Sequence, residues 1–250
     1  MAKFTALLAA ALVAAGALAR AGALADAGID TPEASYFWGG YAGSRHGLTM
    51  TVTAGDFGDT PCYRVSLESR VSSDVLSLRR ADMRPLYVDR RARRRGTGMG
   101  DYHEQWEGPG EEIDWPEKRL DKVLPFKAPP YDLYCLAYCL RGFPFGREKE
   151  VHFRLLMPNG AVYHAFALFL QAGSVDVAGT TRPAYRLKAG LSGFSGLFSP
   201  KLFADYAQAP GHALLGYHYT GTLFSKPMRY DLIRWWRPDQ EEAGDGPPGR

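Results

Sequence analysis

Apolar and polar residues alternate with a period of two along most of the chain between residues 36 and 236. The alternation is clear in GLTMTVTA at 47–54, where Leu, Met and Val are separated by threonine. Two further strand-like runs flank Asn159-Gly160, a residue pair preferred in type I′ hairpin turns. Because a period of two sends neighbouring side chains to opposite faces of a strand, the pattern predicts a mainly antiparallel β protein with short Gly and Pro turns.

The run AVYHAFALFL at 161–170 is apolar on both faces of its predicted strand. A strand of this kind must be covered on two sides. Two arrangements satisfy this requirement: a sandwich-like core strand, or a curved sheet or open barrel whose concave face forms an apolar cavity. The predicted fold is therefore a single domain with a curved antiparallel sheet of the open-barrel or sandwich-like type.

A cavity would draw its lining from aromatic residues and from the two histidines that lie among aromatics. The glycine- and serine-rich segment AGLSGFSGLFSP at 189–200 adds two phenylalanines, and it forms either a lid over a pocket or a loop packed on the core. The candidate ligand-binding residues are Tyr163, His164, Phe166, Phe169, Phe194, Phe198 and His218.

A short helix is predicted at about 131–141, in YDLYCLAYCLR. Asp132 is a suitable N-cap, and Gly142 followed by Pro144 ends the helix. Leucines, tyrosines and cysteines occupy its whole circumference, so we expect the helix to be buried on several sides.

The helix carries Cys135 and Cys139, and the third cysteine is Cys62. Residues four apart on a helix have Cβ atoms about 5–6 Å apart, whereas a disulfide requires about 3.5–4.5 Å. These two cysteines therefore do not pair with each other on an intact helix. In an oxidising compartment Cys62 is a candidate disulfide partner for Cys135 or Cys139, and the odd count leaves at least one free thiol.

The N-terminus has the organisation of a secretory signal peptide. One lysine precedes an apolar Ala/Leu run, and small-x-small sites end at Ala19 and Ala25. We expect a signal peptide at 1–25, a linker at 26–35, the β-rich domain at 36–236 and a disordered Gly/Pro-rich acidic tail at 237–250. The mature protein would then be periplasmic, with no transmembrane segment.

The middle of the chain resembles a family of exported bacterial proteins catalogued as domain of unknown function 3108. The matching positions are Pro130, Tyr131, Asp132, Leu140, Arg141 and Gly142, with Pro85 and Gly179 at two turns and a similar first strand in SYFWGGYAGSRHGLTMTV. The resemblance covers about residues 36–234, and the cysteines depart from the family pattern. It implies export and a β-rich fold, and it carries over no activity or catalytic residue.

The strongest local charge feature is DRRARRRGTG at 89–98. Alternate arginines of an extended chain point to opposite faces, which places this segment at an exposed hairpin end. Arginine suits phosphate and other anionic groups, so a contact with an anionic surface is the functional alternative. The residues concerned are Arg90, Arg91, Arg93, Arg94 and Arg95.

No motif in the sequence indicates a particular reaction. GxSxG, GxGxxG and HExxH are missing, and the six histidines are scattered, so we expect no metal, no cofactor and no catalytic residue. Removal of residues 1–25 lowers the formal net charge from +3 to +1, which gives no argument for nucleic acid.

Three classes of function stay open. The first is binding or carriage of an apolar or lipidic ligand, as in the open-barrel carriers that move lipoproteins. The second is a non-enzymatic envelope scaffold that binds protein partners through sheet edges. The third is a hydrolase with dispersed catalytic residues, which would require Ser44 or Ser195 beside a histidine and a carboxylate.

Overall fold

The computed structural model describes residues 24–41, 43–93, 102–107, 110–115, 120–125, 130–157, 160–221 and 226–237. These residues form fifteen strands of a single sheet. The strands are β1 Glu33–Tyr41, β2 Ser44–Phe57, β3 Thr60–Ser69, β4 Ser72–Arg79, β5 Pro85–Ala92, β6 Tyr102–Glu107, β7 Gly110–Trp115, β8 Leu120–Pro125, β9 Tyr131–Asp132, β10 Glu150–Leu156, β11 Val162–Val177, β12 Thr180–Leu191, β13 Leu202–Ala207, β14 Leu214–Tyr219 and β15 Met228–Trp236.

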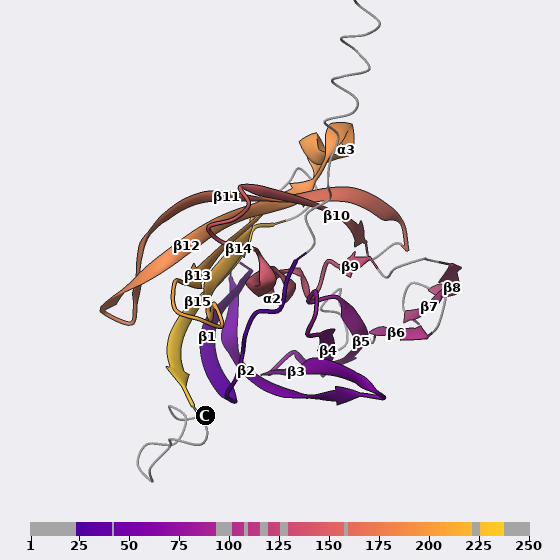
Figure 1. The fold of residues 1–250 in the computed structure, drawn as a ribbon, viewed down its shortest axis with the longest axis horizontal. Helices are drawn as coiled ribbons and strands as arrows, with labels where there is room; N and C mark the ends of the chain where they lie inside the picture. The colour runs from indigo at the N-terminus through magenta and orange to yellow at the C-terminus, as the bar shows by residue number, and fades with distance from the viewer. Residues whose placement is uncertain are drawn as a thin grey trace, which may run out of the picture.

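Strands that follow one another in the sequence are neighbours in the sheet, except β8 and β9, and β1 additionally pairs with β15. The order is β8-β7-β6-β5-β4-β3-β2-β1-β15-β14-β13-β12-β11-β10-β9, so the first strand pairs with the last. All neighbours are antiparallel except β9 and β10, which pair in parallel through two residues. The strands curl around the short helix α2 (Leu136–Cys139) into a barrel-like shape (Figure 1), and the two unpaired edges are β8 and β9.

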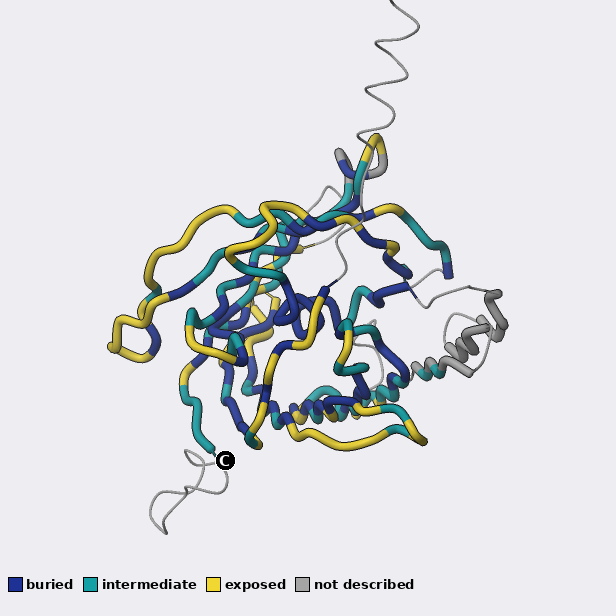
Figure 2. Tube along the Cα trace, viewed as in Figure 1, coloured by how far each residue is buried: buried dark blue, intermediate teal, exposed yellow. Residues whose placement is uncertain are grey.

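The concave side of the sheet holds the core. Alternate residues of β2 point inward and are buried, from His46 to Val52, while the threonines between them are half-buried or exposed. The same alternation buries Leu202, Ala204 and Tyr206 of β13. The long β11–β12 hairpin has an exposed tip that projects from the barrel (Figure 2). The period of two in the sequence is thus the in–out alternation of a curved sheet.

The surroundings of β11 decide between a sandwich-like core strand and a curved sheet or open barrel. Ala165 and Ala167 point into the barrel and are fully buried. On the convex side Phe166 and Leu168 are half-buried, and Leu170 is 41% exposed. No second sheet covers this face, because all described strands belong to one sheet. The curved-sheet interpretation is confirmed.

The helix is shorter than predicted. Tyr131 and Asp132 form β9, α2 spans Leu136–Cys139, and a 3-10 turn, η2, follows at Leu140–Gly142. Asp132 does not cap α2: its carboxylate accepts a hydrogen bond from the Tyr134 backbone N–H at 2.6 Å. This local bond and the pairing of β9 with β10 hold the first residues out of the helix. The prediction of a buried helix is nevertheless confirmed, since every residue of α2 is buried.

The segment that precedes β1 packs against one end of the barrel. Leu24, Ala27 and Ile29 are buried. The Ala25 N–H donates to the Gly142 carbonyl at 2.7 Å, and the Ile29 N–H donates to the Tyr63 hydroxyl at 3.0 Å. This end of the interior is therefore closed by the first part of the expected linker at 26–35 together with Leu24 and Ala25, the last two residues of the expected signal peptide. Strand β1 begins at Glu33.

Arg141 lies at the centre of that closed end and is 2% exposed. Its Nε donates to the Gly211 carbonyl at 2.9 Å, and its guanidinium forms an ion pair with Glu33 of β1. One side chain thereby connects η2, the first strand and the turn between β13 and β14.

Among the described residues, no helix is long and apolar enough to cross a membrane.

The proposed disulfides of Cys62 are wrong for this structure. Cys62 lies on the convex face of β3, because its neighbour Tyr63 points into the core. Cys135 and Cys139 lie inside the barrel, on the other side of the sheet. All three are free thiols, and the Sγ atoms of Cys135 and Cys139 are 3.5 Å apart, well beyond a bond of about 2.05 Å.

A thiol count tests this arrangement. All three cysteines are buried, and burial is the main cause that raises the pKa of the Cys62 thiol. We expect a thiol-specific reagent to label no cysteine in the folded protein and all three in denaturant without reductant. Mass spectrometry of the alkylated protein gives the count, and a single labelled thiol in denaturant would contradict the structure.

Candidate ligand-binding cavity

A cavity of about 640 Å³ occupies the end of the barrel opposite the N-terminal segment. It lies between α2 and the inward faces of β1 to β5, β14 and β15. Its volume falls in the range of about 300–1,000 Å³ that is usual for small-molecule sites. The apolar part of its wall is Leu48, Leu67, Val71, Leu133, Ala137 and Met228.

Tyrosines make up much of the remaining wall. They are Tyr41, Tyr134, Tyr138, Tyr217, Tyr219 and Tyr230. The rings of Tyr217 and Tyr230 stack with centroids 5.2 Å apart, and Tyr138 of α2 meets Tyr217 edge to face at 6.4 Å. The Tyr219 hydroxyl donates to the Leu133 carbonyl at 3.2 Å. These contacts fix the rings, so the cavity has a stiff amphipathic wall.

These tyrosines come together because of the strand register. Tyr217 and Tyr219 are two apart on β14, so both point inward, and Tyr217 pairs across the ladder with Tyr230 of β15. Tyr134 and Tyr138 are four apart in the turn and helix that the sheet surrounds. Burial, the largest cause in each case, raises the pKa of Tyr138, Tyr217 and Tyr219 well above the ordinary value.

One ion pair is built into the cavity wall. The Arg90 Nε and Nη2 donate to the two Asp74 carboxylate oxygens at 3.1 and 2.6 Å. The guanidinium lies over the Tyr134 ring, 4.5 Å from its centroid. Burial disfavours the charged form of Arg90, but the hydrogen bonds and charge of Asp74 outweigh it and raise the pKa. The two opposite charges sum to zero, so the pair carries no net charge inside the cavity.

Arg90 was expected at an exposed hairpin end, and this placement is wrong. Its side chain is 12% exposed and points inward, because it lies opposite Asp74 in the β4–β5 ladder. Arg91 points outward, is 78% exposed and pairs with Asp89. Arg93 is half-exposed and pairs with Glu68. Arg94 and Arg95 lie outside the described residues.

His46 is the histidine of the cavity. Its Nε2 lies 3.0 Å from the Tyr230 hydroxyl and its Nδ1 lies 3.3 Å from the Ser44 carbonyl oxygen. Burial, with a smaller effect of the Arg70 charge, lowers its pKa, so the ring is neutral near pH 7.

The hydrolase alternative required Ser44 or Ser195 beside a histidine. The Ser44 contact with His46 is through the backbone, and in the described part of the chain no serine hydroxyl is hydrogen-bonded to a histidine. The Ser195 side chain lies outside the described residues.

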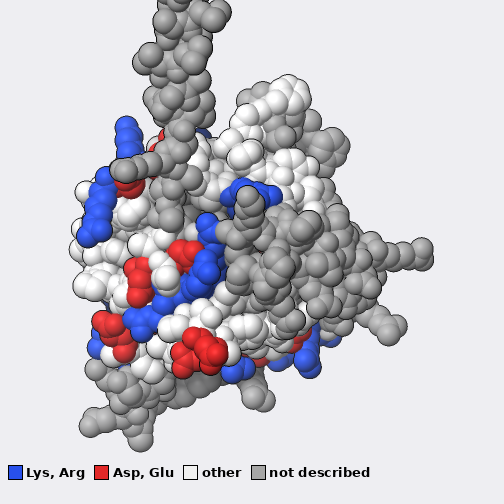
Figure 3. Space-filling model, turned by 45° about the vertical axis from the view of Figure 1, so that its right-hand side comes forward, with Lys and Arg blue, Asp and Glu red and all other residues white. Residues whose placement is uncertain are grey.

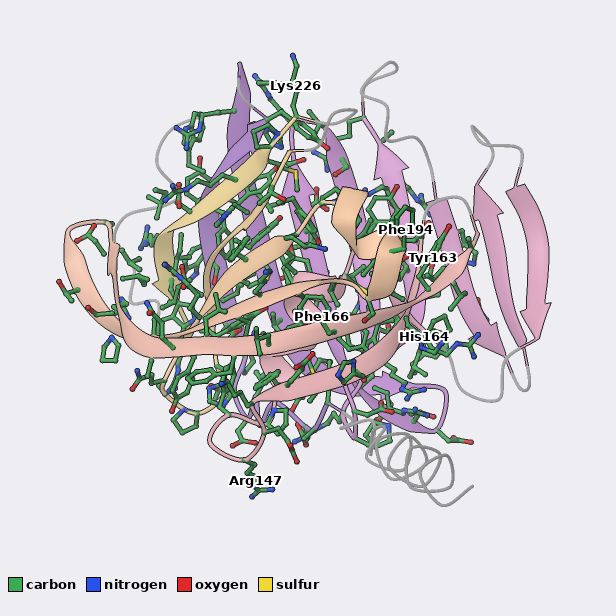
Figure 4. All side chains as sticks on the ribbon, turned by 90° about the horizontal axis from the view of Figure 1, so that it is seen from above. Arg147, Tyr163, His164, Phe166, Phe194 and Lys226 are labelled. Atoms are coloured by element: carbon green, nitrogen blue, oxygen red, sulfur yellow. The ribbon has the colours of Figure 1, made fainter. Side chains whose placement is uncertain are left out.

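The candidate ligand-binding residues do not line this cavity. Figure 4 shows Tyr163, His164 and Phe166 on β11 and Phe194 on the short helix α3 (Gly193–Phe198), away from the end marked by Lys226. His164 is exposed, and Phe194 is 77% exposed.

The other candidates have structural contacts elsewhere. His218 stacks on Phe203 of the neighbouring strand, 4.9 Å between centroids, with its side chain exposed. Phe169 packs edge to face on Tyr185 in a separate aromatic cluster. The Phe198 side chain lies outside the described residues. The predicted residues on β11 belong to the most apolar strand of the sequence, whereas the cavity lies against β1 to β5, β14 and β15.

Charged side chains gather on the outside of the barrel. Figure 3 shows a band of Lys and Arg across one face, with Asp and Glu beside it. In the described ranges no group of His, Cys, Asp and Glu has the arrangement of a metal site. A hollow of about 810 Å³ on the outer face around Cys62 and Arg64 is larger, but the cavity beside α2 has the more apolar wall and is the candidate site.

Comparison with known proteins gives no function for this chain. No family model and no curated protein matches the sequence, so membership of domain of unknown function 3108 stays a prediction. The chain is similar to a solved structure described as a beta-barrel-like protein of domain of unknown function DUF1849 from Brucella abortus. The identity is 8%, the match covers 83% of this chain and 98% of that chain, and the TM-score is 0.48.

Proposed function

We propose that the protein binds an apolar or lipid-like molecule in the cavity above α2, and that it does so in the periplasm. The observation that carries the proposal is a preformed cavity of about 640 Å³ whose wall combines aliphatic side chains with fixed tyrosine rings. Ligand sites of this size are lined mainly by apolar and aromatic groups, with a few polar groups that orient the ligand. Here those polar groups are the tyrosine hydroxyls and the Asp74–Arg90 pair.

A cavity-filling variant tests the proposal. Ala137 lies on α2 in the cavity wall, so Ala137→Phe places a ring in the space that the ligand would occupy. Ala172→Phe is the matched control, because Ala172 is exposed on the projecting β11–β12 hairpin. Met228→Trp, at the half-buried start of β15, supplies a second filling variant should Ala137→Phe fail to fold.

The measurement is native mass spectrometry of protein purified from a periplasmic extract, followed by incubation with envelope lipids. We expect an apolar adduct on the wild type and on Ala172→Phe, and a loss of affinity of about tenfold or more, equivalent to about 1.4 kcal/mol, in the filling variants. A bare mass for the wild type, unchanged after incubation, would overturn the proposal. The envelope-scaffold alternative would then lead, with the exposed Phe194 and the open edges β8 and β9 as its contact surfaces.

A further inference from the structure

We infer that the ligand is an anionic amphiphile, whose apolar part enters the cavity while its negative group stays at the mouth beside Arg70 and Lys226. The inference rests on the proposed function and adds the chemical class of the ligand. Three features of the described residues support it: the position of the two cations, the absence of a local counter-charge for them, and the neutrality of the interior.

The mouth of the cavity lies between three turns. Ser44 begins β2, Ser69 and Ser72 flank the β3–β4 turn, and Lys226 precedes β15; all four line the cavity. Lys226 stands at one end of the barrel, opposite Arg147 (Figure 4). These four residues come from chain segments far apart in the sequence.

Arg70 lies beside this mouth, between the lining residues Ser69 and Val71. It lies in the β3–β4 turn, and its Nη2 donates to the Arg45 carbonyl on β2 at 3.2 Å. Its charge also contributes to the lowered pKa of His46, a residue of the cavity wall, although burial is the larger cause. The positive field of Arg70 therefore reaches the cavity.

Two other described arginines near the mouth are already paired. Arg93 pairs with Glu68, and Arg45 lies 3.7 Å from Asp231. Within the described ranges, Arg70 and Lys226 have no carboxylate within ion-pair distance. Two positive charges are thus available to an anionic group at the entrance.

The described residues give the interior no net charge, and its one open cationic donor is the buried Arg90 Nη1, which has no hydrogen-bond partner among them. Asp74 and Arg90 neutralise each other, His46 is uncharged near pH 7, and the tyrosines keep their protons. Burial of an ionised group here without a partner is unfavourable, whereas burial of an apolar chain is favourable. The charge distribution thus orients an amphiphile with its tail inside and its anion outside.

Two probes that differ only in charge test the inference: a fluorescent long-chain fatty acid and its methyl ester. We expect the wild type to bind the carboxylate about tenfold more tightly, because charge-assisted hydrogen bonds are stronger than neutral ones but are weakened by solvent at the mouth. In Arg70→Gln/Lys226→Gln this preference should be lost, because the carboxylate affinity should fall to that of the ester. An alkyl phosphate of equal chain length distinguishes a phosphate from a carboxylate as the preferred anion.

The matched control is Arg147→Gln/Lys149→Gln. Both side chains are exposed, and Arg147 lies at the opposite end of the barrel, so the net charge changes equally without change at the mouth. This control should retain the preference for the carboxylate. Equal wild-type affinities for acid and ester, or equal losses in the two double variants, would overturn the inference while the binding function stands. Failure of both probes to bind would instead contradict the proposed function itself.

Discussion

Replacing Arg141 by methionine is expected to lower the free energy of unfolding by about 3–5 kcal/mol, the usual cost of removing one partner of a buried ion pair. Arg141 is 2% exposed and pairs with Glu33, which is also buried. Without the guanidinium, the Glu33 carboxylate would be an unpaired charge, and the Gly211 carbonyl would lose its donor. The contact between η2, β1 and the β13–β14 turn would be lost with it.

Urea unfolding followed by circular dichroism measures the effect, with two further variants as controls. Arg147→Met makes the same replacement at an exposed position and should change stability by less than about 0.5 kcal/mol. Arg141→Met/Glu33→Gln removes both charges and should recover part of the loss, since no buried charge is left unpaired. A loss below about 1 kcal/mol for Arg141→Met alone would show that the pair does not hold this end of the barrel.

A steep loss of stability between about pH 10 and pH 12 is the second large effect that we expect. Burial raises the pKa of Tyr230 to about 12, and it also raises the pKa of the other interior tyrosines. These are Tyr131, Tyr134, Tyr138, Tyr206, Tyr217 and Tyr219.

The sign follows from proton binding. Above pH 10 the unfolded chain releases its phenolic protons, since the ordinary pKa is about 10, while the folded protein retains them. The stabilisation is therefore complete below pH 10 and declines as the pH rises through the folded pKa. Each such tyrosine contributes a slope of about 1.4 kcal/mol per pH unit in this window, so several together unfold the protein.

Absorbance of the phenolate and far-ultraviolet circular dichroism, recorded against pH, test this expectation. Ionisation of the interior tyrosines should coincide with loss of the sheet signal. Tyr230→Phe should reduce the slope by about 1.4 kcal/mol per pH unit. Full ionisation near pH 10 with an unchanged sheet signal would show that the tyrosine wall is open to solvent.

The strands were predictable because the signal for them is local. The apolar runs on either side of Asn159-Gly160 are β10 and β11, which pair antiparallel from Glu150 to Leu168. The end of the helix at Gly142 was also correct, since η2 ends there. The start was wrong, because the parallel pairing of Tyr131 and Asp132 with β10 overrides the capping preference of aspartate.

The site was not predictable in the same way. Local apolarity pointed to Phe166, which lies on the convex face, and to Phe194, which is exposed on α3. The cavity instead combines side chains from the first five strands, the turn and helix at 133–138, and the last two strands. The one signal of the cavity in the sequence is the spacing of its tyrosines, two apart at 217 and 219 and four apart at 134 and 138. The first spacing indicates one face of a strand and the second one face of a helix, but neither shows that the two faces meet.

The sequence by itself determined the period-two strands, their hairpin turns and a short buried helix, because each depends on residues close together in the chain. The tertiary structure decided what those elements enclose. Pairing of β1 with β15 brings the two ends of the domain together and curls the sheet around α2. That closure turns Arg90 inward against Asp74, separates Cys62 from the other cysteines and gathers the tyrosines around one cavity. These outcomes depend on contacts between distant segments, which no local pattern specifies.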